Sequence, residues 1–243
     1  MNEVEKRYLT SLIEKANVFE LFNDGMYIMG NLESDETTKG LVYLNDIDGW
    51  LRNINYLIEQ INESANTVMN FIERENETKF SFWGTEHSEA FYYTENIMFR
   101  LTILWDLLAQ LCNTVFKLNE DADCVSYKKF FKKYNDEKYG YNGLKEMAEL
   151  VVSYIDEEEN DEKHTNPWNG NHTYVNNLRN SFTHRLNPHI VNFHNASFKK
   201  AGNEKEGMTF PVHPLYEIKR MLEDYNKAYI FISTVRKKVV KPI

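Results

Sequence analysis

The chain has 243 residues, of which 42% are hydrophobic and 14% aromatic, and its formal net charge is −9. This composition supports a packed core and excludes a disordered chain. The acidic balance excludes a protein that coats nucleic acid through overall positive charge, so any RNA contact must come from local basic groups. Small basic clusters are found at Lys128-Lys129, Lys132-Lys133, Lys199-Lys200 and Arg236-Lys237-Lys238. For each cluster, a solvated helix face or tail is the plain alternative.

Neither the cysteines nor the apolar segments indicate secretion or a membrane. The two cysteines, Cys112 and Cys124, form no disulfide framework and no zinc motif. The charged N-terminus leads into no apolar run typical of a signal peptide. The most apolar stretch, residues 101–116, is interrupted by polar residues such as Asp106 and Asn113 and is too short to cross a membrane. We therefore expect a cytoplasmic protein without membrane contact.

The first part of the chain, residues 1–80, is predicted to be a helical N-terminal extension. A helix is expected over residues 3–22, followed by a turn-rich stretch in which 27–29 and 41–43 are short extended pieces. Between residues 45 and 75, apolar side chains recur at steps of three and four, which predicts a long amphipathic helix. Its apolar positions are Ile47, Trp50, Leu51, Ile54, Leu57, Ile58, Ile61, Val68, Phe71 and Ile72.

The helix predicted over residues 86–118 is the most hydrophobic one. It is apolar nearly all round, which is typical of the central helix of a bundle. A polar stripe follows one side of it, because its members are seven, four and seven residues apart. These members are Glu95, Thr102, Asp106 and Asn113.

Three segments follow before the chain reaches its most informative helix. Short helices are predicted over residues 126–133 and 144–154, and the acidic stretch 156–163 is expected to be a solvated loop. The next helix is expected over residues 171–186. It ends before Pro188, because proline cannot continue the helical hydrogen-bond ladder.

The C-terminal part completes the predicted bundle. Residues 190–212 are expected to be an irregular loop, and a last helix is expected over 214–238. The sequence therefore predicts an all-α fold. One helical bundle over residues 81–243 would carry the N-terminal extension described above.

The helix over 171–186 combines an apolar stripe with polar residues that could act on a substrate. The stripe consists of Val175, Leu178, Phe182 and Leu186, at steps of three and four. At about 100° per residue, His184 lies opposite this stripe, Asn180 shares the face of His184, and Arg179 lies at the stripe's edge. Arg179 and His184 are thus about 140° apart around the axis. They meet at one phosphate only through the long arginine side chain or through a second copy of the helix that faces the first.

These residue types allow a specific chemistry. Histidine can move a proton near neutral pH, and arginine presents a fork of donors that suits phosphate. Asparagine can orient an imidazole or a ribose hydroxyl. Together they could cleave an RNA phosphodiester without a metal, with the 2′-hydroxyl as nucleophile. The alternative is that the arginine and the histidine are solvated, or interact only with the dipole at the helix C-terminus.

At these residues the sequence resembles the HEPN superfamily. Its motif is an arginine, then commonly a polar residue, a few further residues and a histidine, on a late helix of an α-bundle. The run Leu178-Arg179-Asn180-Ser181-Phe182-Thr183-His184 matches it, with asparagine in the polar position. The aromatic-rich segment 91–106 is similar to an earlier HEPN helix. The resemblance covers residues 86–238 and leaves the N-terminal extension outside it.

The resemblance implies a metal-independent endoribonuclease, without a cofactor, in which two motifs meet across a homodimer. Arg179 would bind the phosphate, His184 would move protons and Asn180 would position them, leaving a cyclic phosphate. Such domains often serve in toxin–antitoxin or antiviral defence systems, so the expected partners are RNA, a second copy of the chain and an antitoxin. A non-catalytic module that binds RNA, a nucleotide or a protein partner through the same groove is the alternative.

Glu95, Arg100 and Asp106 are candidate supporting residues for this motif. An acidic residue buried beside it could orient His184 or Arg179. A polar seam in a helix interface is the alternative for all three. The histidines at 184, 189 and 194 do not predict a metal site, because they are five residues apart and Pro188 breaks the helix between the first two.

Overall fold

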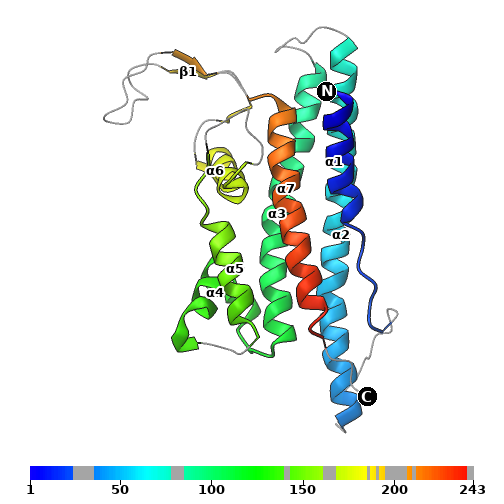
Figure 1. Cartoon of the computed structure of the whole chain (residues 1–243), viewed down its shortest axis with the longest axis vertical. Helices are drawn as coiled ribbons and strands as arrows, with labels where there is room; N and C mark the ends of the chain where they lie inside the picture. Colours follow the sequence, from blue (N-terminus) through cyan, green and yellow to red (C-terminus); the bar gives the residue numbers. More distant parts are fainter. Residues whose placement is uncertain are drawn as a thin grey trace.

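A computed structural model describes residues 1–23, 36–77, 85–139, 143–160, 168–184, 187–189, 192–194, 207–209 and 212–239. Three long helices form the body of the molecule and run side by side along its longest axis (Figure 1). They are α2 (Glu36–Glu77), α3 (Thr85–Val115) and α7 (Pro214–Arg236). A shorter helix, α1 (Glu3–Lys15), packs against α7 and α2.

The remaining helices lie along the other side of α3 and α7 (Figure 1). They are α4 (Tyr127–Asn135), α5 (Lys145–Ile155) and α6 (Asn171–His184); the short 3₁₀ turn η1 (Ala122–Cys124) precedes α4, and η2 (Glu137–Tyr139) lies between α4 and α5. The helix α6 touches α3, α5 and α7, so three elements hold it. Between α6 and α7 the strands β1 (Asn192–His194) and β2 (Gly207–Thr209) pair antiparallel, with Phe193 opposite Met208.

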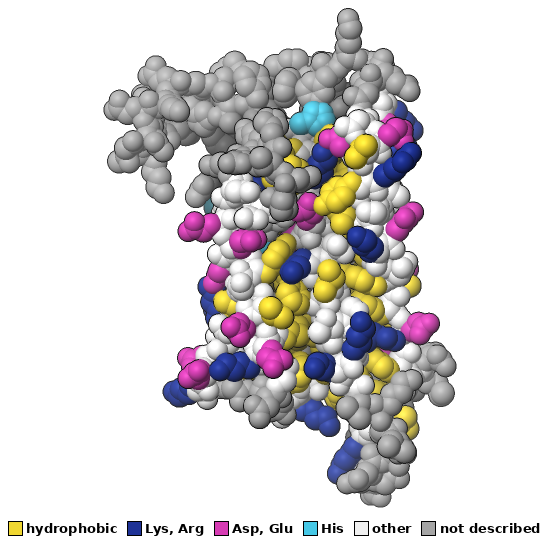
Figure 2. Space-filling model, in the orientation of Figure 1, with side chains coloured by type: hydrophobic (Ala, Val, Ile, Leu, Met, Phe, Trp, Pro, Cys, Tyr) yellow, Lys and Arg dark blue, Asp and Glu magenta, His cyan; other side chains and the backbone are white. Residues whose placement is uncertain are grey.

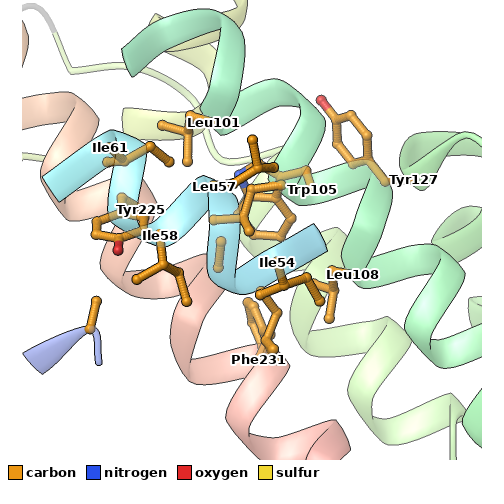
Figure 3. Packing of buried hydrophobic residues seen from close by; sticks show 14 of the residues in the cluster. Ile54, Leu57, Ile58, Ile61, Leu101, Trp105, Leu108, Tyr127, Tyr225 and Phe231 are labelled. Atoms are coloured by element: carbon orange, nitrogen blue, oxygen red, sulfur yellow. The ribbon is translucent and has the colours of Figure 1, made fainter. Parts of the chain in front are cut away.

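One hydrophobic core runs through the bundle and includes the N-terminal helix. Figure 3 shows Ile58 of α2, Trp105 of α3 and Phe231 of α7 converging in it. The α1 residues Leu9 and Leu12 are buried in the same cluster. Because burying a leucine side chain stabilises a protein by about 1.5–3 kcal/mol, α1 contributes to the stability of the whole bundle.

The first helix is shorter than the sequence predicts, because long-range hydrogen bonds replace helical ones after Lys15. The backbone N–H of Phe19 donates to Oδ1 of Asn55 at 2.7 Å. The N–H of Phe22 donates to a carboxylate oxygen of Asp48 at 2.8 Å. Both acceptors lie on α2. The residues after Lys15 therefore cross the surface of α2 as an irregular segment held by these hydrogen bonds.

The other predicted elements agree with the structure in most places. The all-α class is confirmed, and the five helices predicted after residue 85 occur within a few residues of the expected positions. Residues 41–43 were expected to be extended and are instead helical, within α2. Residues 27–29 and the predicted domain boundary at residues 80–81 lie outside the described residues, so that boundary stays a prediction. The region 190–212, expected to be irregular, contains β1 and β2.

The shared core makes the stability of the bundle depend on α1. We expect Leu9→Ala to lower the free energy of unfolding by about 2–5 kcal/mol, because the fully buried leucine leaves a cavity between α1 and its neighbours. Urea unfolding followed by circular dichroism measures this loss. Val4→Ala on the same helix is the control, because Val4 is 77% exposed. Equal stability of both variants would show that α1 is not part of the cooperative core.

Candidate functional site

The start of α6 is fixed by a buried polar network that joins four helices. Asp224 of α7 accepts a hydrogen bond from the indole N–H of Trp105 on α3 at 3.2 Å. The Nδ1 atom of His172 on α6 lies 3.2 Å from the same carboxylate, and its Nε2 atom lies 2.8 Å from the hydroxyl of Tyr127 on α4. This geometry fits an imidazole whose Nδ1–H donates to Asp224 and whose Nε2 accepts from Tyr127. The network sets both the position and the rotation of α6.

The segment that enters α6 is held by a buried arginine. Arg220 of α7 is fully buried and donates to the backbone oxygens of Asn160 and Asn169 and to Oδ1 of Asn171, each at 3.0–3.1 Å. Next to this arginine, Gly170 has a φ of +66°, and a Cβ atom there would lie 2.5 Å from the backbone of Glu159. Only glycine fits this left-handed, crowded position. The chain therefore reaches the first residue of α6 by one fixed path.

Arg179 lies at the outer edge of the buried network, beside Asp106. It is half-buried, one turn after Asn176, whose Oδ1 lies 3.3 Å from the hydroxyl oxygen of Tyr127. Asp106 of α3 accepts the backbone N–H of Tyr127 at 3.0 Å. Partial burial raises the pKa of the Asp106 carboxyl, although that N–H and the positive charge of Arg179 act in the opposite direction. The charge of Arg179 thus acts on Asp106, and the role of Asp106 as a residue that supports the motif stays a prediction.

The other two motif residues face solvent. Asn180 and His184 are both exposed, and no described residue forms a hydrogen bond with either side chain. His184 is the last residue of α6. Val175 and Leu178 are buried on the opposite side, as the helical spacing predicted.

Glu95 has a different partner from the predicted one. Its carboxylate lies 2.9 Å from Nδ1 of His189, and Nε2 of His189 lies 2.8 Å from the carboxylate of Glu217 on α7. The imidazole ring also stacks on Phe91, with ring centroids 4.2 Å apart, and meets the edge of Phe182 at 4.8 Å. This His189 bridge links α3 to α7 and packs against α6, five residues after His184.

The charges in this bridge are strongly coupled. Burial disfavours the charged imidazole, but hydrogen bonds and attraction from Glu217 and Glu95 outweigh this and raise the pKa of His189 to about 9. Burial also raises the pKa of Glu217, in spite of His189. At neutral pH, His189 is therefore a charged donor to both carboxylates.

Arg100 is not brought to the motif. Its guanidinium donates to Oδ1 of Asn96 at 2.9 Å and to Oε1 of Gln60 on α2 at 3.4 Å. Arg100 therefore links α3 to α2. On α3 it is about 140° around the axis from Glu95, which explains why the two residues have different neighbours.

Comparison with known proteins identifies the family. A family model described as HEPN_Cthe2314-like HEPN matches residues 50–243. The chain belongs to this HEPN family. No curated protein and no solved structure matches it. The match includes the motif helix α6 and all the helices that hold it. HEPN modules are generally ribonuclease-like or nucleotide-related.

Within this HEPN protein, the residues that hold the motif helix are not predicted by the sequence pattern. His172 and Asp224 were not singled out, and His189 was considered only as a metal ligand. The signal for His172 was its spacing, since it is three residues before the buried Val175 on the same side of α6. In the part of the chain that the structure describes, no group of three or more His, Cys, Asp or Glu side chains is arranged to hold a metal ion.

A hollow on the HEPN bundle lies away from the motif. It encloses about 300 Å³ between α5 and α7, and its lining includes Leu150, Lys227 and Ile230. Figure 2 shows apolar side chains gathered on this face, with lysine and arginine side chains around them. None of the motif residues lines the hollow, so it is not the site that the motif predicts. Among the described helices, none is long and apolar enough to span a membrane.

The His189 bridge makes stability depend on pH. The pKa of His189 is raised from 6.5 to about 9, so its protonation stabilises the fold fully below pH 6.5, and this stabilisation is lost as the pH rises through 9. We expect the free energy of unfolding to fall by about 3 kcal/mol over this range. Urea unfolding at a series of pH values measures it.

The matched variants separate His189 from other titrating groups. In His189→Gln, the free energy of unfolding should fall much less between pH 6.5 and 9 than in the wild type, because glutamine does not titrate. His184→Ala, which removes an exposed histidine, should keep the wild-type decline. If His189→Gln declines as steeply as the wild type, the bridge does not control the pH dependence.

Proposed function

We propose that this HEPN protein is a metal-independent endoribonuclease that acts where the α6 motifs of two copies meet. One observation carries this proposal: Arg179 is half-buried beside Asp106, whereas His184 is exposed five residues later. On a helix, five residues correspond to about 140° around the axis and roughly 7.5 Å along it. Within one copy, only the long arginine side chain could bring both groups to one phosphate. A second α6 that faces the first supplies the missing group.

The residue chemistry supports RNA cleavage. The Arg179 guanidinium would bind the phosphate and stabilise the charge that develops on it, while Asp106 positions the arginine. His184 would take the proton from the 2′-hydroxyl, whose oxygen attacks phosphorus as the bond to the 5′-oxygen breaks. That 5′-oxygen gains a proton, and the products are a cyclic phosphate and a 5′-hydroxyl end. Asn180, which shares the face of His184, would orient the imidazole or the ribose.

An exposed apolar stripe on α3 supports a second copy as the partner. Tyr92, Phe99 and Ile103 are 60%, 40% and 49% exposed, and their spacing of seven and four residues places them on one face. The ring of Phe99 meets that of Phe182 on α6, with centroids 6.5 Å apart. The stripe therefore continues to the motif helix. Exposed apolar side chains next to an incomplete site favour burial in an interface.

A nuclease of this kind suits a toxin–antitoxin or antiviral defence system. RNA would be its target, an antitoxin its restraining partner and the cytoplasm its place of action. The family membership supports this setting, because HEPN domains often dimerise and bind RNA.

The first test is cleavage of labelled RNA by the purified protein in EDTA. We expect wild-type protein to cleave, and we expect His184→Ala and Arg179→Ala to be about 10²–10⁴-fold slower, because each removes proton transfer or phosphate binding. Arg7→Ala is the matched control, since it removes an exposed arginine on α1. Equal cleavage by all four proteins, or cleavage by none, would contradict the proposal. RNA binding without cleavage would instead favour the non-catalytic module.

The second test asks whether two copies share one site. When Arg179→Ala and His184→Ala are mixed and allowed to exchange subunits, half of the dimers contain one copy of each. Each mixed dimer then has one site with an intact arginine from one copy and an intact histidine from the other. We expect roughly a quarter of the wild-type rate to return. If the mixture stays as inactive as the separate variants, the two residues act within one copy.

A further inference from the structure

The first turn of α4 is clamped against the motif helix by one residue, Tyr127. Its backbone N–H donates to Asp106, and its hydroxyl contacts His172 at 2.8 Å and Asn176 at 3.3 Å. Tyr127 is 5% exposed, so the clamp is buried. The residues that follow Tyr127 are therefore held close to Arg179, which is one turn beyond Asn176 on the same side of α6.

The next residue, Lys128, is a cation without an acidic contact. Four lysines lie on α4, and two of them are paired: Lys132 with Asp156 at 2.8 Å, and Lys133 with Glu120. Lys128 is exposed, and no described carboxylate lies within ion-pair distance of it. Its ammonium group instead lies 5.8 Å from the centre of the Tyr127 ring.

The charge of Arg179 also acts on Lys128. The pKa of the Lys128 ammonium group is lowered, chiefly by partial loss of water; the charges of Lys132 and Arg179 act in the same direction, whereas those of Asp156 and Asp224 act in the opposite direction. The positive end of the α4 dipole lies at the same place. Two cations held near each other by buried contacts are stabilised when each of them binds an anion. In an RNA strand, the group that meets this requirement next to one bound phosphate is the neighbouring phosphate.

We propose that Lys128 binds the RNA phosphate adjacent to the one held by Arg179, so that α4 and α6 together form a two-point site for the RNA backbone. This inference rests on the proposed function, since it takes RNA as the substrate. It assigns no base specificity to Lys128, because phosphate contacts fix the register of a strand without reading its sequence.

The test is the salt dependence of RNA binding by the full chain carrying His184→Ala, which prevents cleavage during the measurement. Fluorescence anisotropy with a labelled, unstructured single-stranded RNA gives Kd at a series of KCl concentrations. Adding Lys128→Ala is expected to weaken binding roughly tenfold at low salt. It should also reduce the slope of log K against log salt by about 0.7, the value for one phosphate contact on a single strand. Lys128→Arg should retain both the affinity at low salt and the slope.

Lys129→Ala is the matched control, because Lys129 is also exposed but lies about 100° further around α4. We expect its slope to equal that of the His184→Ala parent. If Lys128→Ala leaves affinity and slope unchanged, or if Lys129→Ala weakens binding as much, the two-point site is wrong.

A kinetic measurement separates this proposal from the proposed function. In the otherwise wild-type chain, Lys128→Ala should raise KM and leave kcat nearly unchanged, as expected for a group that binds substrate without taking part in the reaction. A chain that binds RNA through Lys128 but cleaves none would overturn the nuclease and keep the two-point site. If the chain cleaves RNA and Lys128→Ala leaves KM unchanged, the two-point site is overturned and the nuclease is kept.

Discussion

The carboxylate of Asp224 is the constraint from which the geometry of the site follows. A carboxylate that is fully buried in the core must have its charge compensated by donors, and losing a partner from such a site costs about 3–5 kcal/mol. The donors here are Trp105 of α3 and His172 of α6, so satisfying one charge fixes two helices relative to α7. Once His172 faces inward, helical geometry turns Arg179 toward Asp106 and His184 toward solvent.

The inner and outer sides of the motif helix therefore carry different kinds of residues. Its inner side carries polar residues that must be fully hydrogen-bonded, because an unsatisfied buried polar group is costly. Its outer side carries Asn180 and His184, which are exposed and add little to stability. Arg179 lies between these sides and is half-buried, and its charge acts on Asp106. The His189 bridge packs against α6 near its C-terminal end. Buried contacts therefore position the side of α6 that carries Asn180 and His184.

Much of this could be predicted from the sequence, where the signal is local. The burial of Val175 and the exposure of His184 follow from a period of 3.6 residues. The predictions that were wrong concern residues whose hydrogen-bond partners are distant in the sequence. The first helix ends early because of acceptors on α2, and Glu95 binds His189, 94 residues away. No spacing rule indicates which of several nearby polar residues a side chain will meet after packing.

The residues that anchor α6 also determine when, during synthesis, the motif helix takes its final position. Arg220, Asp224 and Glu217, which fix the entry, the start and the end of the motif helix, all belong to α7. During synthesis, the ribosome makes Arg179 and His184 well before it makes these anchors. A nascent chain that carries the motif but not α7 has no fixed α6, and hence no oriented arginine or histidine. The motif residues are thus oriented only after the last helix has been made.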